Sequence, residues 1–361
     1  MSKMASSAVA QEKTAGQELV VATFRLDDFP VETIIEVLCY LDFETLDNMV
    51  SVNRRFKKII ETHWASIFPT TIERDFSPTD GFYEVLQEII FPDQSVSNTG
   101  SGFGGLFPLI NFCRVIKRWE AEFPRLRFSE APDQSRSLRP HEICRMRDAL
   151  YIWWRYGRYF DNPWPRLDNG PEARRVFFRR FSTSQLHEVL DFWRTVHHAV
   201  ARRVCPSFTE VQGFLGKSAT KEEVDRIGWG DEVDSEYIAE TMMKLGPEDI
   251  LHLVLYRHRY ATKTSVIQVI RMRHPRIEEN LYTFHGPIVD VGEERRVTFF
   301  PSPGFPDAHG GILDHEDHDN GERLRAFYSG DAGRGWNVYP SARRDMDRLT
   351  AVRVGRLDPS A

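Results

Sequence analysis

The stretch at residues 26–41 reads LDDFPVETIIEVLCYL and carries more apolar residues than a short solvent-exposed helix can hide. Apolar residues at helical spacing form one continuous face, made of Val31, Ile34, Ile35, Leu38 and Leu41. Pro30 suits a first helical position, where its missing N–H costs nothing. Because Val37, Cys39 and Tyr40 lie off that face, the pattern predicts a helix that is apolar nearly all round.

Two further short helices are predicted directly after this one. Asp42 is a good N-cap for a second helix, with Phe43, Leu46, Met49 and Val50 on one side. Ser51 is expected to cap a third helix, with Val52, Phe56, Ile59 and Ile60 aligned and Trp64 in the next turn. Three such helices barely close a core. The surplus apolar surface therefore packs either on the rest of the chain or on another protein.

The remaining pattern divides the chain into further segments. Residues 69–105 read as a helical extension around GFYEVLQEIIF, followed by a Ser- and Gly-rich linker. Residues 106–340 carry long helical patterns, with Ser182 or Ser184 as one N-cap and Pro247 in a first turn. After Gly286 the chain becomes loop-rich, with PIVDVG, RRVTFF and WNVY as brief β-like runs at best. Residues 341–361 are expected to form a flexible tail.

Composition narrows the class of protein. Hydrophobic residues make up 41% and charged residues 28%, as in soluble globular proteins. The net charge of −6 argues against general nucleic-acid binding, and no apolar run is long enough for a membrane helix. Four scattered cysteines fit a reducing compartment. Residues 1–23 read as a disordered polar leader without a signal peptide, so we expect a cytoplasmic or nuclear location.

The sequence FPVETIIEVLCYLDFETLDNMVSVNRRFKKIIETHW resembles an F-box. The family pattern begins Leu-Pro-x-Glu, continues through an aliphatic helix and a second Leu-rich helix, and closes with Val-x-Arg/Lys-x-aromatic and a Trp. Residues 24–68 follow this order and spacing, with Phe29-Pro30-Val31-Glu32 at the start and Trp64 at the end. Phe29 replaces the usual Leu, and Thr33 replaces a usual aliphatic residue.

This resemblance implies a fold and a function. It implies a mainly α protein, with a small three-helix F-box and a larger helical domain that is similar in style to the bodies of fungal F-box proteins. It also implies a non-catalytic subunit without cofactors, which docks on the Skp adaptor of a cullin–RING ubiquitin ligase and recruits a protein substrate. The implied adaptor-binding residues are Pro30, Ile34, Ile35, Leu38, Leu41, Leu46, Val50 and Trp64.

Other residue clusters suggest different chemistry. The stretch 307–322 places His309, His315 and His318 among acidic residues, and imidazole with carboxylate can bind zinc. Because Gly, Asp and Asn favour a loop there, a solvated acidic loop is the default interpretation. No HExxH, GxSxG, phosphate loop or GxGxxG after a strand is present, so no catalytic or metal residues are assigned.

Aromatic and basic stretches leave two alternatives open. YIWWRYGRYF, residues 151–160, can stack bases or form a core helix whose Arg residues reach water, and we favour the core. RRVFFRRF, RHRY and RMRHPR can dock a partner, but neighbouring acidic runs favour a mixed surface. The alternative functions are a metal-dependent or nucleic-acid-acting enzyme in the helical body, or an F-box scaffold outside ubiquitination.

Overall fold

The structure, a computed structural model, describes residues 29–90, 106–129, 132, 135–161, 170–256, 262–274, 284–297 and 311–313. Every regular element within these ranges is helical, which confirms the predicted mainly α fold. The expected leader, the Ser- and Gly-rich part of the linker and the C-terminal tail all lie outside the described ranges. None of the described helices is long and apolar enough to span a membrane.

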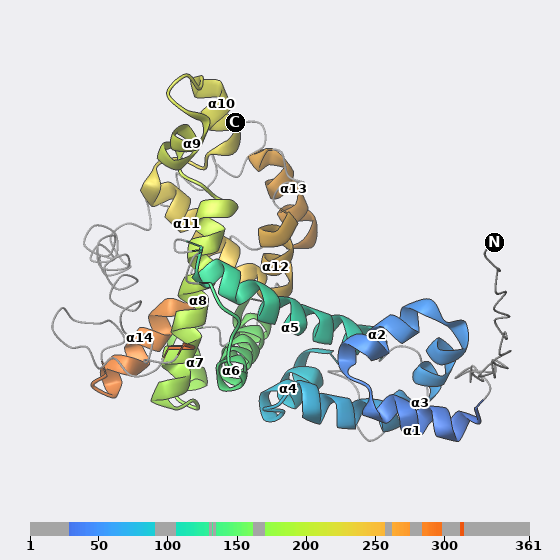
Figure 1. Cartoon of the computed structure of the whole chain (residues 1–361). Helices are drawn as coiled ribbons and strands as arrows, with labels where there is room; N and C mark the ends of the chain where they lie inside the picture. Colours follow the sequence, from blue (N-terminus) through green and yellow to red (C-terminus); the bar gives the residue numbers. More distant parts are fainter. Residues whose placement is uncertain are drawn as a thin grey trace, which may run out of the picture.

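The N-terminal unit is drawn in blue in Figure 1 and extends to one side of the body. Its elements are α1 (Val31–Tyr40), α2 (Phe43–Val52), α3 (Arg54–Asp75), α4 (Asp80–Val85) and the π-helix η2 (Leu86–Ile90). Helix α3 runs through the boundary predicted between residues 68 and 69, with Pro69 inside it and non-helical backbone angles at His63. The three short helices are therefore continuous with the extension that follows.

The body rises beside this unit as a bundle of long helices with shorter ones at its ends (Figure 1). Its first elements are α5 (Leu106–Arg127), α6 (Pro140–Tyr156), η5 (Gly157–Asp161), α7 (Pro171–Phe178) and α8 (Thr183–Arg203). They are followed by α9 (Phe208–Leu215), α10 (Lys221–Ile227), α11 (Glu232–Met242), η6 (Met243–Leu245), α12 (Pro247–Tyr256), α13 (Lys263–Arg273) and α14 (His285–Glu294). Ser182 caps α8 and Pro247 begins α12, as the sequence predicts.

The core of the body lies where α5, α6 and α8 meet. Trp119 of α5 contacts Phe192 of α8 with ring centroids 5.4 Å apart, and Trp153 of α6 lies 5.9 Å from the same ring. Phe123 stacks on Phe192 at 5.2 Å. All four side chains are buried, so aromatic packing fixes the mutual positions of the three helices.

The aromatic–Arg helix belongs to this core, which confirms the favoured interpretation. Tyr151, Trp153 and Tyr156 are buried on α6. Arg155 does not extend into water as the core hypothesis supposed. It is buried and pairs with acidic residues of the N-terminal extension.

The β-like interpretation of PIVDVG is wrong, because residues 287–292 lie inside α14. Ile288 and Val291, three residues apart, are both buried in the core. A short apolar run fits either a strand or one buried side of a helix. The choice between them depends on what the run packs against, which the sequence does not show. RRVTFF is described only at residues 295–297, with a turn at Arg295 and Arg296, and WNVY lies outside the described residues.

Candidate functional site

The N-terminal unit closes a small core of its own. Helices α1 and α2 both pack on α3. Ile34 and Leu38 are fully buried on one side of α1, and Leu46 and Val50 are buried on α2. The i, i+4 spacing of each pair directs both members toward α3. This core uses only part of the apolar surface that the sequence supplies.

The structure separates the eight implied adaptor-binding residues into two groups. Ile34, Leu38, Leu46 and Val50 are buried in the core of the unit, and their expected contact with an adaptor stays a prediction. Pro30 is exposed at the start of α1. The other three are partly exposed while packing against the core, and they are Ile35, Leu41 and Trp64. This second group is the part of the eight that reaches the surface of the unit.

The unit also exposes apolar side chains that were not predicted from the sequence to bind the adaptor. Tyr40 is 84% exposed at the end of α1, and Val52 is 85% exposed at the end of α2. Phe29 and Val31 are also exposed at the start of α1. Val52 was expected in the third helix, alongside Phe56, but α2 ends there. For Tyr40, helical spacing places the ring off the main apolar face of the helix. This spacing was the one feature of the sequence that pointed to its exposure.

The caps explain where the short helices begin and end. The Asp42 carboxylate accepts from the Thr45 main-chain N–H at 2.7 Å, which confirms the predicted N-cap and lowers the pKa of Asp42. The predicted Ser51 cap is wrong, since Asn53 caps α3 by accepting from the Arg55 N–H at 2.8 Å. Ser51 instead donates to the Asp47 carbonyl oxygen one turn earlier. Either residue type can cap, and only the packing of α2 fixes the boundary.

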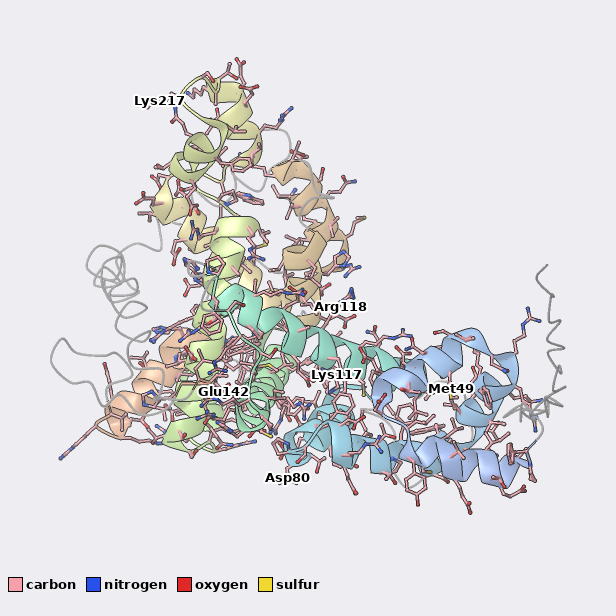
Figure 2. The ribbon with its side chains drawn as sticks, viewed as in Figure 1. Met49, Asp80, Lys117, Arg118, Glu142 and Lys217 are labelled. Atoms are coloured by element: carbon pink, nitrogen blue, oxygen red, sulfur yellow. The ribbon has the colours of Figure 1, made fainter. Side chains whose placement is uncertain are left out.

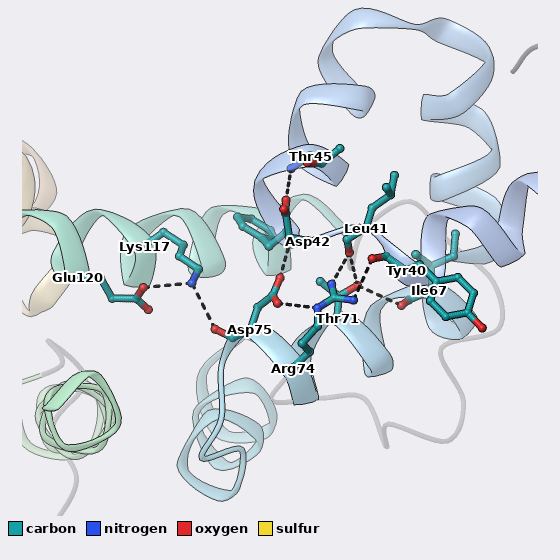
Figure 3. Close-up of polar contacts among 11 residues, drawn as sticks. Tyr40, Leu41, Asp42, Thr45, Ile67, Thr71, Arg74, Asp75, Lys117 and Glu120 are labelled. Carbon is teal, nitrogen blue, oxygen red and sulfur yellow. Dashed lines mark hydrogen bonds and ion pairs between the residues drawn. The ribbon is translucent and has the colours of Figure 1, made fainter. Parts of the chain in front are cut away.

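A polar cluster fixes the turn between α1 and α2 against the end of α3 (Figure 3). Arg74 donates to the main-chain oxygens of Tyr40, at 3.1 Å, and of Leu41. Asp75 accepts from the Phe43 N–H at 2.7 Å and from the Arg74 Nε at 2.8 Å. The Asp75 carboxylate is the first cause of the raised pKa of Arg74. The bonds to Tyr40, Leu41 and Phe43 join residues over thirty positions apart in sequence, so no local pattern could reveal them.

The same cluster connects the unit to the body. Lys117 of α5 donates to the Asp75 carbonyl oxygen at 3.3 Å and to Glu120 at 3.1 Å (Figure 3). Arg114, one turn earlier, holds the Asp47 carboxylate of α2 through two hydrogen bonds of 2.7 and 2.6 Å. In Figure 2, Lys117 lies on α5 between the unit, marked by Met49, and the body. Helix α5 therefore contacts the unit through paired charges.

Helix α6 adds a second connection that is largely buried. Arg147 donates to the Ser77 carbonyl oxygen at 2.7 Å and to Glu120 at 2.8 Å. Arg155 pairs with Glu88 through hydrogen bonds of 2.9 and 3.0 Å and also with Glu84. The bonds to Ser77, Glu84 and Glu88 join residues about seventy positions apart. They hold the extension after α3 against the body.

The basic clusters form a mixed surface where they are described. Arg179 pairs with Glu172 at 2.8 Å and with Glu294 at 2.6 Å. Arg174, from the same cluster, is fully buried with its guanidinium 4.9 Å from the Phe160 ring centroid. Charges that are paired or buried in this way are poorly placed to bind phosphates. RHRY lies outside the described residues.

The proposed metal chemistry is not tested by the described residues. His309, His315 and His318 all lie outside the described ranges. Within those ranges, no three His, Cys, Asp or Glu side chains are placed to hold a metal ion. The four cysteines are free thiols, and two of them, Cys113 and Cys205, are buried.

The comparisons with known proteins agree with the geometry of the N-terminal unit. Residues 26–65 match the F-box domain model, which covers α1, α2 and the first part of α3. No curated protein and no solved structure matches the chain in the corresponding searches. The match ends just after the bend of α3 at His63 and includes neither the rest of α3 nor the body.

Proposed function

The chain is an F-box protein, with its F-box domain at residues 26–65, and we propose that it is a substrate receptor of a cullin–RING ubiquitin ligase. F-box domains bind Skp-type adaptors, and proteins that carry them are generally non-catalytic ligase subunits. In this proposal the unit α1–α3 docks on the adaptor, and the body α5–α14 holds a protein to be ubiquitinated. The mechanism is proximity, since tethering raises the effective concentration of the substrate near the conjugating enzyme.

The observation that carries the proposal is the apolar surface left on the unit after its own core has closed. Val31 and Ile35 lie one turn apart on α1 and keep part of their surface, next to exposed Pro30. Exposed apolar side chains gathered on so small a unit are typical of a protein interface. We assign Pro30, Ile35, Leu41 and Trp64, together with Val31, to adaptor contact.

The connection between unit and body supports a receptor that works by positioning. The bonds from Arg114 to Asp47 and from Arg147 to Ser77 come from two different helices of the body. Contacts from two helices restrain rotation as well as translation. A substrate on the body would therefore keep a fixed orientation relative to the adaptor, which proximity catalysis requires.

The end of the body far from the F-box domain offers a surface for a substrate. Helices α9 and α10 lie at that end in Figure 1, and Lys217 marks the turn between them in Figure 2. Phe214, at the end of α9, is 89% exposed. Val233, at the start of α11, is exposed as well. This position would hold a substrate away from the adaptor.

Co-purification with a Skp adaptor tests the proposal. The wild-type chain should form a stable complex, and Val31→Asp together with Ile35→Asp should weaken it at least tenfold, because two carboxylates would be desolvated at the interface. Val176→Asp on α7 is the matched control, since Val176 is similarly exposed but lies on the body. Circular dichroism should show all variants folded. Leu38→Asp is unsuitable, because Leu38 is fully buried and its replacement would unfold the unit.

Two results would contradict the proposal. Either the intact chain fails to bind the adaptor, or the double variant binds as tightly as the Val176→Asp control. Recovery of the cullin in the same complex distinguishes a ligase subunit from an F-box scaffold outside ubiquitination. Zinc analysis of the purified chain tests the metal-dependent alternative, which depends on His309, His315 and His318.

A further inference from the structure

Three residues from the C-terminal part of the chain lie against the centre of the body. Gly311, Ile312 and Leu313 belong to no helix or strand, and they appear in Figure 1 as a short red trace beside α8. The Ile312 side chain is fully buried and joins the continuous core, with Leu313 packed partly against it. The nearest described residue before them is Val297, after the end of α14. A single aliphatic side chain therefore enters the core from a bend outside the helices.

A fixed carboxylate receives the main chain of this segment. The Ile312 N–H donates to Asp191 Oδ2 of α8 at 3.0 Å. The other oxygen, Oδ1, pairs with Arg127 of α5 at 2.6 Å, and both side chains are mostly buried. Arg127 also donates to the Thr195 hydroxyl at 3.0 Å, and that hydroxyl donates to the Asp191 carbonyl oxygen at 2.9 Å. The Asp191 carboxylate is thus held by Arg127 of α5 through one oxygen, while the other oxygen is directed at a peptide N–H.

The same carboxylate selects the residue before Ile312. A Cβ atom added to Gly311 would lie 2.9 Å from Asp191 Oδ2 and 3.2 Å from its Cγ. These distances are shorter than ordinary van der Waals contact, so something would have to move. Asp191 cannot easily turn away, because its pair with Arg127 holds it. The position accordingly accepts glycine and excludes residues with side chains.

Together these contacts are of the kind that recognise a short peptide segment. One buried aliphatic side chain supplies the anchor, one main-chain N–H sets the register, and one position without a side chain gives selectivity. We propose that Asp191, Arg127 and the buried position of Ile312 form a peptide-docking site that residues 311–313 occupy in cis. A Gly-Ile or Gly-Val segment of a recruited protein would replace them.

This inference deepens the proposed function, because it gives the recruited substrate a recognition motif, but its test does not use the adaptor. The probe is a fluorescein-labelled peptide of residues 306–317, PDAHGGILDHED. The receptor is the full chain with Ile312→Asp, in which the anchor in cis is disabled. Fluorescence anisotropy should show saturable binding to this variant and at least tenfold weaker binding to the wild-type chain, where the site is filled.

Two controls establish that the contacts described above are responsible. Peptides carrying Gly311→Val or Ile312→Asp should lose binding at least tenfold, through the clash with Asp191 and the loss of the anchor. Adding Asp191→Ala to the Ile312→Asp chain should reduce binding of the unchanged peptide to a similar extent. Binding that ignores these changes would be non-specific and would overturn the proposal.

A negative result in the peptide-binding experiment can be distinguished from a negative result for the proposed function. A folded Ile312→Asp chain that does not bind the peptide would overturn the docking site. If Ile312→Asp unfolds, Gly311→Val in the chain replaces it as receptor, because it blocks the approach and keeps the isoleucine. Unfolding of both variants would identify the segment as a permanent part of the core, against the proposal. Adaptor binding by the Ile312→Asp chain should be unchanged in either case.

Discussion

Arg147 of α6 donates a hydrogen bond of 2.7 Å to the main-chain oxygen of Ser77, two residues after the end of α3. The guanidinium also pairs with Glu120 of α5 at 2.8 Å and lies 5.7 Å from the Phe76 ring centroid. One buried side chain thus contacts α5 and the segment after α3 from its place on α6. Its removal would leave the Ser77 carbonyl oxygen and a mostly buried carboxylate without this donor.

We therefore expect Arg147→Met to lower the free energy of unfolding by about 2–4 kcal/mol, as for other broken buried pairs. Methionine keeps most of the buried volume, so the loss reports the polar contacts. The control is Arg125→Met, because Arg125 is largely exposed and pairs with Glu122 on the same helix. That change should cost less than about 0.5 kcal/mol. Urea denaturation measures both, and equal losses would contradict the assigned role of Arg147.

The boundary between α2 and α3 can be tested with two neighbouring residues. Asn53→Ala removes the side-chain oxygen that accepts from the Arg55 N–H, and it should cost about 1 kcal/mol of stability. Ser51→Ala removes only a hydroxyl that donates to a carbonyl oxygen of its own helix, so it should be close to neutral. Thermal denaturation distinguishes the two. A larger loss for Ser51→Ala would restore the cap that the sequence suggested.

Two glycines give a test of helix packing between the extension and the body. A Cβ atom on Gly81 of α4 would lie 2.9 Å from Tyr151 Cδ2, and Tyr151 is buried on α6. Gly81→Ala should therefore destabilise the protein by about 1–3 kcal/mol through overpacking. Gly157→Ala meets nothing within 4 Å and has helical backbone angles, so it should be neutral or stabilising by about 0.5 kcal/mol. Chemical denaturation of both variants checks the difference.

Two buried histidines should make the protein less stable in acid. Burial, and then neighbouring His198, lowers the pKa of His197 to about 4; burial, with Arg194 and His197 nearby, lowers that of His285 to about 3. Because both folded-state pKa values lie below the unfolded value of about 6.5, the unfolded chain binds these protons first. Stability is fully present above pH 6.5 and falls as pH decreases toward 4.

The slope of that loss is the measurable quantity. Each such histidine contributes up to about 1.4 kcal/mol per pH unit below the unfolded pKa. His197→Gln should make the decline between pH 6.5 and pH 4.5 correspondingly shallower, although the lost stacking on Trp193, 4.8 Å away, lowers stability at every pH. Ser51→Ala, which changes no titratable side chain, serves as control and should leave the slope unaltered. An unchanged slope for His197→Gln would disprove the assignment.

The sequence determined the helical class, the position of the F-box and the identity of several caps. These features depend on local spacing, as with Asp42 before α2 and Ser182 before α8, so a short window contains the information. The excess of apolar residues at 26–41 could also be read from the sequence, because it needs only a count of apolar side chains along one helix. The local pattern could not show which of these apolar side chains face the core of the unit.

Tertiary structure decided that distribution and every long-range contact. Ile34 and Leu38 are buried while Ile35 keeps part of its surface, since α3 covers only one side of α1. Asp191 contacts Arg127, which lies 64 residues earlier in the chain (191 − 127 = 64), and Ile312, which lies 121 residues later. Burial and pairing of this kind depend on which elements meet in space. Because the partners are far apart in sequence, a local sequence pattern cannot predict these contacts.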